Sequence, residues 1–166
     1  MNSKIIVKES KVHGKGVFAL EDIKKGTKLL EYIGEKITKE EGLRRANKAL
    51  ENSKIDPTKG AVYLFDLNKK YDLDGDVPNN PAKYINNSCS PNCEFDVKNG
   101  RVWIFTKKNI KSGEEITINY CYSYKESLEH PCKCGSKDCI GYIVDPSEKK
   151  KLLKKIADLK ASQGIF

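Results

Sequence analysis

Short stretches of alternating apolar and polar residues recur along this chain. Ile5 and Val7 lie two residues apart in a short apolar stretch near its start, and Ile116 and Ile118 alternate with polar residues much further along. A two-residue period puts one side of a strand against a core, so these stretches are predicted to be strands. Short strands are expected at residues 4–9 (an edge strand), 29–33, 61–67 and 116–120.

The clearest hairpin lies between residues 94 and 106. Two strand-like stretches, 94–97 and 102–106, flank the sequence Asn99-Gly100. Asparagine and glycine tolerate the positive φ angles that a two-residue type I′ turn requires. The sequence therefore predicts two antiparallel strands joined by this turn.

One helix is predicted over about residues 38–51. Thr38 and Glu41 have the spacing of a capping box, in which each side chain bonds the backbone amide of the other residue. Three apolar residues then recur on one face at helical spacing: Leu43, Ala46 and Leu50.

A second helix is predicted to begin at residue 145. Asp145 suits the cap, Pro146 the first helical position and Glu148 the third. Four apolar residues follow at helical spacing: Leu152, Leu153, Ile156 and Leu159. The helix is strongly basic, and we expect its apolar face to dock on the domain rather than to bind nucleic acid or a membrane surface.

Irregular segments separate these elements. The sequences DIKKGTKL at 22–29 and NIKSGEEI at 109–116 resemble each other, and each is predicted to be a glycine turn that starts a strand. This likeness is interpreted as local rather than as a repeat. Residues 71–81 are expected to form a loop. Many short strands, irregular loops and few helices together predict a mainly β fold.

Composition narrows the class of protein. A length of 166 residues suits one domain with a substantial core, and 38% hydrophobic with 33% charged residues is typical of a soluble protein. The sequence has no run of about 18 apolar residues and no signal-peptide pattern, so neither membrane contact nor secretion is expected. The net charge of +8 makes nucleic acid a secondary candidate partner, but much of the excess is concentrated at 149–155.

The cysteines indicate a metal site. Three of the six, Cys132, Cys134 and Cys139, lie in one short loop, which favours a metal in a reducing, intracellular compartment over a disulfide scaffold. Structural zinc usually takes four tetrahedral ligands, so a fourth ligand must come from elsewhere. The candidates are His130, Cys89, Cys93 and Cys121.

Residues 83–93, KYINNSCSPNC, are rich in groups that bind ligands. Asn86, Asn87 and Ser88 offer three consecutive side chains that both donate and accept hydrogen bonds. Pro91 stops any helix and fixes a turn. Such a segment suits a loop that presents polar groups to a bound ligand, although a surface turn with two incidental cysteines fits these residues equally well.

Gly14 and Gly16 form a second candidate site. Glycines allow the backbone to turn sharply or to approach a ligand closely, and a plain hairpin turn is the commoner case. Lys15 and Phe18 would add a cation and an aromatic face to a nucleoside pocket.

Six motifs, taken in order, resemble the SET-domain family of protein-lysine methyltransferases with a zinc-binding post-SET tail: HGKGVFA, EYIGE, YLFDL, KYINNSCSPNC, GEEITINYCY and CKCGSKDCIGYI. Each motif is weak alone, but the ordered set is specific and extends from about Ile5 to Ile143. The resemblance implies the SET-domain (β-clip) fold of short irregular sheets, with a segment threaded under a loop as a pseudoknot. It also implies three parts without a cysteine-rich pre-SET segment: a SET domain at 1–125, a zinc-bound post-SET segment at 126–144 and a basic amphipathic helix at 145–166.

The resemblance also assigns individual residues. Tyr120 corresponds to the catalytic tyrosine, and Tyr32 and Tyr122 are assigned to the catalytic group with it. Cys89 corresponds to the fourth zinc ligand, which completes a set with Cys132, Cys134 and Cys139. The substrate channel is expected to contain Phe95 and Ile118. S-adenosylmethionine is expected to bind His13, Gly14, Lys15, Gly16, Phe18, Tyr84, Asn86 and Asn87.

The implied activity is methyl transfer from S-adenosylmethionine to the lysine ε-amine of a histone or histone-like protein. The chain departs from the family at four positions, where histidine, arginine, aspartate and an aromatic residue are common: Asn87, Lys83, Asn119 and Ile118. The competing hypothesis is a zinc-stabilised basic module that binds nucleic acid without catalysis, with Trp103 and the tyrosines as stacking surfaces.

Overall fold

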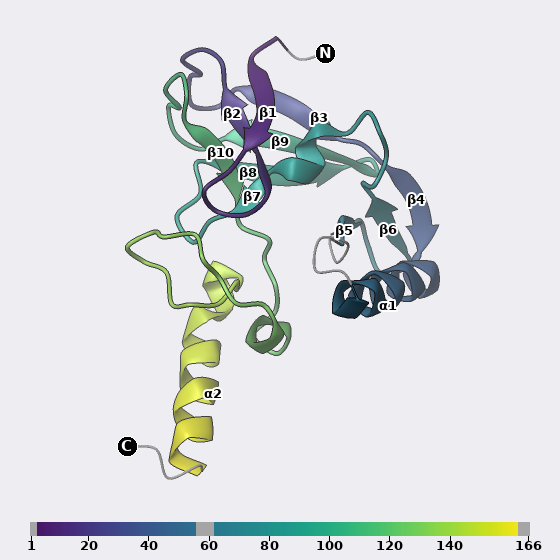
Figure 1. Cartoon of the computed structure of the whole chain (residues 1–166), viewed down its shortest axis with the longest axis vertical. Coiled ribbons are helices and arrows are strands. Elements are labelled where there is room, and N and C mark those ends of the chain that lie inside the picture. Colours follow the sequence, from purple (N-terminus) through teal and green to yellow (C-terminus); the bar gives the residue numbers. More distant parts are fainter. Residues whose placement is uncertain (1–2, 56–61, 163–166) are drawn as a thin grey trace.

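The computed structural model describes residues 3–55 and 62–162, which form three small sheets and two α helices (Figure 1). The first sheet has the order β1 (Ile5–Glu9), β2 (Lys15–Ala19), β10 (Glu115–Ile118), β7 (Asn86–Asn87). The second has the order β3 (Lys28–Tyr32), β9 (Arg101–Thr106), β8 (Cys93–Lys98). The third has the order β4 (Glu35–Thr38), β6 (Tyr71–Asp74), β5 (Leu64–Asp66). Three short 3₁₀ segments lie at Pro81–Tyr84, Glu126–Glu129 and Pro146–Glu148.

The predicted mainly β class is confirmed, as are most of the predicted strands. β1 is an edge strand, and β8 and β9 form the predicted hairpin, with φ angles of 53° at Asn99 and 73° at Gly100. The strand expected at 61–67 is shorter, since only Leu64–Asp66 pairs and residue 61 lies outside the described residues.

The prediction of a loop at 71–81 is wrong at the start of this range, because Tyr71–Asp74 forms the central strand of the third sheet. The two aspartates in this stretch argued against a strand in the sequence, because acidic residues are depleted in strands. Both aspartates are nearly buried, and basic side chains from the first helix neutralise them. Lys39 Nζ lies 2.6 Å from Asp72 Oδ1, and Arg45 Nη1 lies 2.6 Å from Asp74 Oδ2.

The two similar turn sequences lie side by side. Ile23 and Ile110 form an isolated antiparallel bridge, with both backbone hydrogen bonds at 2.8 Å. The cap contacts are reciprocal, because Asn109 Oδ1 accepts from the Lys25 amide at 2.8 Å and Asp22 Oδ1 accepts from the Ser112 amide at 2.9 Å. The likeness that was interpreted as local therefore corresponds to two turns that stabilise each other.

β10 lies between β2 and β7 and connects distant parts of the chain. It pairs with β7 in parallel, with Thr117 opposite Asn86 and Ile118 opposite Asn87. This pairing places the Asn86 segment beside the strand that leads to Tyr120. Ile116 and Ile118 are buried in the same apolar core as Val17, so the polar loop around Asn86 is attached to a rigid strand.

The first helix, α1 (Lys39–Ile55), is longer than the predicted 38–51. Thr38 caps it as expected, accepting a 3.2 Å hydrogen bond from the Glu41 amide, but the Glu41 carboxylate bonds Arg44 and Arg45 instead of completing the capping box. The predicted apolar face does not enter the core: Leu43 is 64% exposed and Leu50 51%. Charge pairs with the third sheet attach this helix to the domain.

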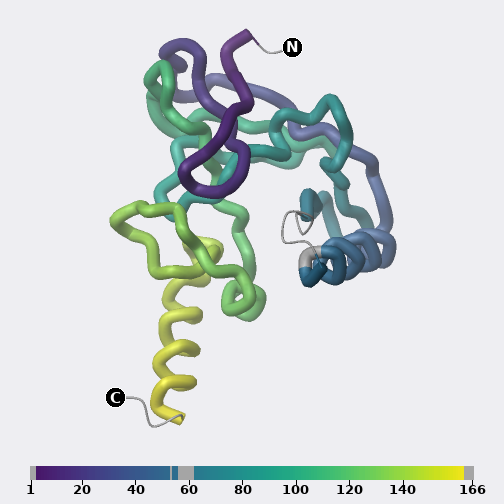
Figure 2. Tube along the Cα trace, in the orientation of Figure 1, coloured from purple at the N-terminus to yellow at the C-terminus, as the bar shows by residue number. Residues whose placement is uncertain are grey.

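The second helix, α2 (Lys149–Ser162), follows the predicted cap, since Asp145 Oδ1 accepts from the Ser147 amide at 2.7 Å. The expected docking of its apolar face is confirmed only in the first part of the helix, at Leu152 and partly at Ile156. Leu152 is fully buried, whereas Leu153 is 46% exposed and Leu159 is 36% exposed. Figures 1 and 2 show α2, in yellow, extending away from the sheets. Within the described residues no helix is both long and apolar enough to cross a bilayer.

Candidate active site and cysteine cluster

A cavity of about 570 Å³ lies between the first sheet, the strand β5 and the segment after β10. This volume falls within the range of about 300–1,000 Å³ typical of small-molecule sites. Ten of the residues predicted for the site line it: His13, Gly14, Lys15, Tyr32, Tyr84, Asn86, Phe95, Ile118, Tyr120 and Tyr122. Residues from four distant parts of the sequence therefore meet in one pocket.

Three residues predicted to bind the donor lie outside the cavity wall. Gly16 is inside β2, where a β-carbon would collide with the Glu115 carboxylate. Phe18 carries the Lys8 ammonium group 4.3 Å from its ring centre, on the part of β2 beyond the cavity. Asn87 points towards the cysteines, and its amide nitrogen lies 3.3 Å from Cys132 Sγ. The structure thus assigns these three to supporting positions.

Asn86 holds the loop that precedes β2. Its Nδ2 donates to the backbone oxygens of His13 at 3.3 Å and Lys15 at 3.0 Å. The same nitrogen lies 2.7 Å from Glu115 Oε1. One side-chain amide thereby fixes both ends of a glycine turn, in which Gly14 has a φ angle of +44°.

Glu115 is a residue of this site that the sequence reasoning missed. Its two carboxylate oxygens lie 2.8 and 2.9 Å from Ser10 Oγ, and Oε1 also accepts from Asn86. The carboxylate therefore joins β10, the loop after β1 and the Asn86 segment. Its position in the motif GEEITINY was the only signal in the sequence, because no local pattern distinguishes Glu115 from its exposed neighbour Glu114.

Aromatic rings form the opposite wall. The Phe65 ring centre lies 5.1 Å from that of Tyr32 and 4.6 Å from that of Phe95, the second pair being edge-on. The Tyr32 hydroxyl donates to the backbone oxygen of Tyr63 at 2.7 Å, and Tyr63 also lines the cavity. Sequence reasoning missed Tyr63 and Phe65, although their spacing of two residues in AVYLFDL could have indicated one shared face.

Tyr120 and Tyr122 close the same region from the segment after β10. The Tyr120 hydroxyl donates to the Ile85 backbone oxygen at 2.9 Å, and its ring centre lies 6.4 Å from that of Tyr122. Tyr122 in turn stacks on His130, with ring centres 3.9 Å apart. Burial raises the pKa of Tyr120, Tyr32 and Tyr122 above the usual range for a phenol, so all three hydroxyls stay protonated at neutral pH.

Two lysines border the cavity beside Tyr84. The ammonium groups of Lys15 and Lys83 each lie 5.4 Å from its ring centre. Burial opposes the charged form of Lys83, but the 2.9 Å hydrogen bond to Asp76 and the charge of that carboxylate together raise its pKa. This part of the wall therefore carries positive charge next to an aromatic face.

Four cysteines meet beside this cavity: Cys89, Cys132, Cys134 and Cys139. Their sulfur atoms all lie within 4.8 Å of one another, and Cys89 Sγ is 3.7 Å from Cys132 Sγ. Tetrahedral zinc with Zn–S bonds of about 2.3 Å requires sulfurs about 3.8 Å apart. Of the four candidates for the fourth position, the structure brings Cys89 to the cluster, whereas Cys93 is in the core and His130 stacks on Tyr122.

Hydrogen-bond donors surround these sulfurs. The backbone amides of Cys89 and Gly141 each lie 3.4 Å from a cluster sulfur, those of Cys134 and Cys139 respectively, and Ser136 Oγ lies 3.3 Å from Cys134 Sγ. Burial opposes ionisation of Cys134, but the Cys89 amide and Ser136 outweigh it and lower its pKa to about 6. Donors of this kind stabilise thiolates, the form in which cysteine binds metal.

The family follows from a sequence comparison. The SET domain profile matches residues 14–121, and the chain therefore belongs to the SET domain family. The matched region contains the cavity lining described above except His13 and Tyr122, together with Cys89. The other three cysteines of the cluster, Cys132, Cys134 and Cys139, follow the matched region, as does α2.

Relatives from distant organisms share this region. Human histone-lysine N-methyltransferase 2D is 31% identical over 140 residues, which cover 81% of this chain and 2% of that protein. Histone-lysine N-methyltransferase set-2 of Caenorhabditis elegans is 36% identical over 138 residues, 81% of this chain and 9% of that protein. Histone-lysine N-methyltransferase SUV39H2 of Xenopus tropicalis is 33% identical over 155 residues, 78% of this chain and 36% of that protein. The chain thus spans a minor part of each of these relatives.

Proposed function

We propose that this chain transfers a methyl group from S-adenosylmethionine to the ε-amine of a lysine in a protein. The observation that carries the proposal is a cavity with two unlike walls. One wall consists of backbone and amide groups around Asn86, and the other consists of aromatic rings around Tyr120. Membership of the SET domain family and the names of the relatives support the same reaction.

The polar wall fits the donor. We assign the methionine end of S-adenosylmethionine to Asn86 and to the backbone of His13 and Lys15, which this asparagine fixes. Tyr84, with its two flanking lysines, offers an aromatic face and positive charge to the remainder of the molecule. The donor supplies an electrophilic methyl group on a sulfonium, so the protein's task is alignment and exclusion of water.

The aromatic wall fits the acceptor. A lysine must lose its proton before it can attack, which costs about 4–5 kcal/mol from a pKa of about 10.4 to neutral pH. A channel of Tyr32, Phe95 and Tyr122 disfavours the charged amine and so reduces this cost. Tyr120 keeps its phenol proton, which is donated to Ile85, and its oxygen lone pairs are then free to accept from the amine.

We assign zinc to the cysteine cluster. The separation of 3.7 Å between the sulfurs of Cys89 and Cys132, together with the surrounding donors, supports four thiolate ligands. Zinc in this position would tie residues 132–139 to the loop after β7. Structural zinc can supply on the order of 10 kcal/mol of folding free energy, which a tail with so few apolar contacts needs. Four reduced thiols also favour a reducing compartment, the nucleus or the cytoplasm.

For the substrate we propose a histone or a histone-like basic protein, because the relatives carry that substrate in their names. The alternative, a nucleic-acid-binding module without catalysis, is not supported. Five of the eight tyrosines, the residues expected to stack on bases, line the cavity instead. Trp103 already contacts two cations, with Lys28 Nζ 3.2 Å and Arg101 Cζ 4.6 Å from its ring centre.

A transfer assay tests the proposal. The zinc-loaded protein is incubated with S-adenosylmethionine carrying a labelled methyl group and with purified histones, ribosomal proteins or a lysate, and the label is mapped by mass spectrometry. We expect label on lysine side chains of a basic protein and far less label with Tyr120→Phe. Donor binding measured separately by calorimetry distinguishes a wrong substrate from a wrong reaction. Absence of donor binding to the folded protein would overturn the proposed function.

A further inference from the structure

The side chain of Asn87 connects the cysteine cluster to Tyr120. Its Oδ1 accepts a 3.0 Å hydrogen bond from the Tyr120 backbone amide, and its Nδ2 donates to Cys132 Sγ at 3.3 Å. Asn87 itself is 6% exposed and lies on β7, paired with Ile118 of β10. One buried amide therefore touches both a candidate metal ligand and the backbone of the candidate catalytic tyrosine.

Chemistry fixes the orientation of this amide. A backbone N–H can only donate, so the atom that faces Tyr120 must be the carbonyl oxygen. The –NH₂ group is then directed at Cys132, where a thiolate is a strong acceptor. The two contacts determine each other, because rotation of the amide by 180° would oppose two donors at Tyr120 and two acceptors at Cys132.

The Tyr120 backbone depends on such contacts. β10 ends at Ile118, so Tyr120 follows the last ladder pair, and Cys121 after it has a φ angle of +55°. After β10, side-chain amides accept the backbone hydrogen bonds that a neighbouring strand would otherwise accept. Asn87 Oδ1 accepts from the Tyr120 amide, and Asn119 Oδ1 accepts from the Cys121 amide at 2.7 Å. The backbone at Tyr120 and Cys121 is therefore positioned by side chains rather than by ladder hydrogen bonds.

We propose that Asn87 is a positioning residue that couples metal binding at the cluster to the placement of Tyr120. The inference rests on the proposed metal site. A metal-bound Cys132 thiolate orients the Asn87 amide, and the amide holds the Tyr120 backbone in the position that aims its hydroxyl at Ile85. In the other direction, the N–H donor stabilises the thiolate, as hydrogen bonds to metal ligands generally do.

Two substitutions separate the two ends of this bridge. Asn87→Asp keeps the oxygen that accepts from Tyr120 and removes the donor to Cys132. Asn87→Ala removes both contacts without adding charge. If the alanine variant fails to fold, Asn87→Ser is used in its place. Asn92→Asp is the matched control. Asn92 also bridges two backbone groups of β10, since it donates to Glu115 O at 2.8 Å and accepts from the Thr117 amide at 2.9 Å. It makes no bond to a sulfur of the cysteine cluster.

Zinc affinity is measured by competition with a chromophoric chelator, and exchange of the Tyr120 amide hydrogen by NMR on the zinc-loaded proteins. We expect zinc to bind 10–100-fold more weakly in both Asn87 variants and unchanged in Asn92→Asp. Tyr120 amide exchange should accelerate at least tenfold in Asn87→Ala and by a smaller factor in Asn87→Asp, whose remaining oxygen is no longer oriented through Cys132. Unchanged zinc affinity in both variants, or wild-type exchange at Tyr120 in Asn87→Asp, overturns the coupling. A wild-type protein that binds no zinc instead overturns the metal site on which the coupling rests.

Discussion

The Tyr120 hydroxyl donates a 2.9 Å hydrogen bond to the backbone oxygen of Ile85, 35 residues earlier in the chain. Ile85 directly precedes Asn86, the residue that fixes the loop of the polar wall. The bond therefore joins Tyr120 to the segment that carries Asn86. Because the phenol proton is donated to Ile85, the Tyr120 oxygen can act towards a bound amine only as a hydrogen-bond acceptor.

Tyr120→Phe should abolish most of the methyl transfer while the protein stays folded. The substitution removes one hydrogen bond, worth about 1 kcal/mol of stability, but also removes the acceptor that orients the lysine nitrogen. Loss of one preorganised polar group of this kind typically lowers kcat by about 10²–10³-fold. Turnover, urea denaturation and donor affinity should be measured together. An unchanged kcat would show that another group orients the amine.

Glu115→Ala should weaken donor binding more than it lowers kcat. The change leaves the amide of Asn86 and the hydroxyl of Ser10 without their shared acceptor, which loosens the loop around Gly14. Loss of hydrogen bonds to a charged partner costs about 1.5–3 kcal/mol. Calorimetry with S-adenosylmethionine should show the loss of affinity, and the exposed neighbour Glu114→Ala is the matched control. Equal donor affinity in the two variants would contradict this role.

Removal of the metal should destabilise the C-terminal part of the chain. Cys139→Ser is expected to lower the zinc content below one ion per chain and to reduce the melting temperature, and a chelator should do the same to the wild type. Cys121→Ser provides the control, because Cys121 is not one of the four clustered cysteines. Metal analysis and thermal unfolding test both variants. A chelator that leaves the wild-type melting temperature unchanged would show that the cluster is not a structural zinc site.

The sequence predicted the cysteine cluster and part of each cavity wall, but it gave no sign of Tyr63 and Phe65 in the aromatic wall. Asn86 and the cysteines are rare groups in short, ordered motifs, so a few residues carry the signal. Phe65 belongs to a strand of three residues that Tyr63 directly precedes, and aromatic side chains at such positions fit a core as well as a cavity. Nothing local to the sequence distinguishes the two settings, because the cavity forms only when β5 meets Phe95 from a different sheet.

The two helices show a second limit of sequence reasoning. Their caps were predicted correctly, because Thr38 and Asp145 act on backbone amides two or three residues away. Their contacts were not, because apolar periodicity shows which side of a helix is apolar and not whether anything covers it. Leu43 and Leu153 accordingly face solvent, while Arg45 and Lys39 make the long-range contacts of α1.

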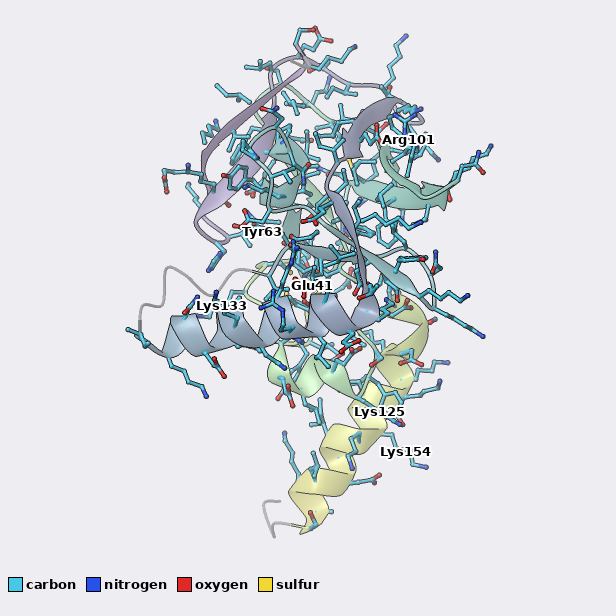
Figure 3. All side chains as sticks on the ribbon, turned by 90° about the vertical axis from the view of Figure 1, so that its right-hand side faces the viewer. Glu41, Tyr63, Arg101, Lys125, Lys133 and Lys154 are labelled. Carbon is cyan, nitrogen blue, oxygen red and sulfur yellow. The ribbon has the colours of Figure 1, made fainter. Side chains whose placement is uncertain are left out.

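The attachment of α1 should weaken in acid through Glu41. Figure 3 shows Glu41 on α1 below Tyr63, and its carboxylate lies 2.7 Å from Arg44 Nε and 2.8 Å from Arg45 Nε. Hydrogen bonds from Arg44 and then Arg45 lower the pKa of Glu41 from 4.5 to about 2. Because the folded state has the lower pKa, this carboxylate contributes stability above about pH 4.5 and loses it as the pH falls towards 2.

Glu41→Gln isolates that contribution. At neutral pH the variant should unfold at lower urea concentration than the wild type, and the difference should shrink steadily between pH 4.5 and 2, since the protonated wild-type side chain then resembles glutamine. Comparing two proteins at each pH cancels the acid effects that both share, including loss of metal from the cluster. Glu51→Gln, in a more distal turn of α1, controls for net charge. A difference between wild type and Glu41→Gln that stays constant over this range would mean that Arg45 is held by Glu35 and Asp74 without help from Glu41.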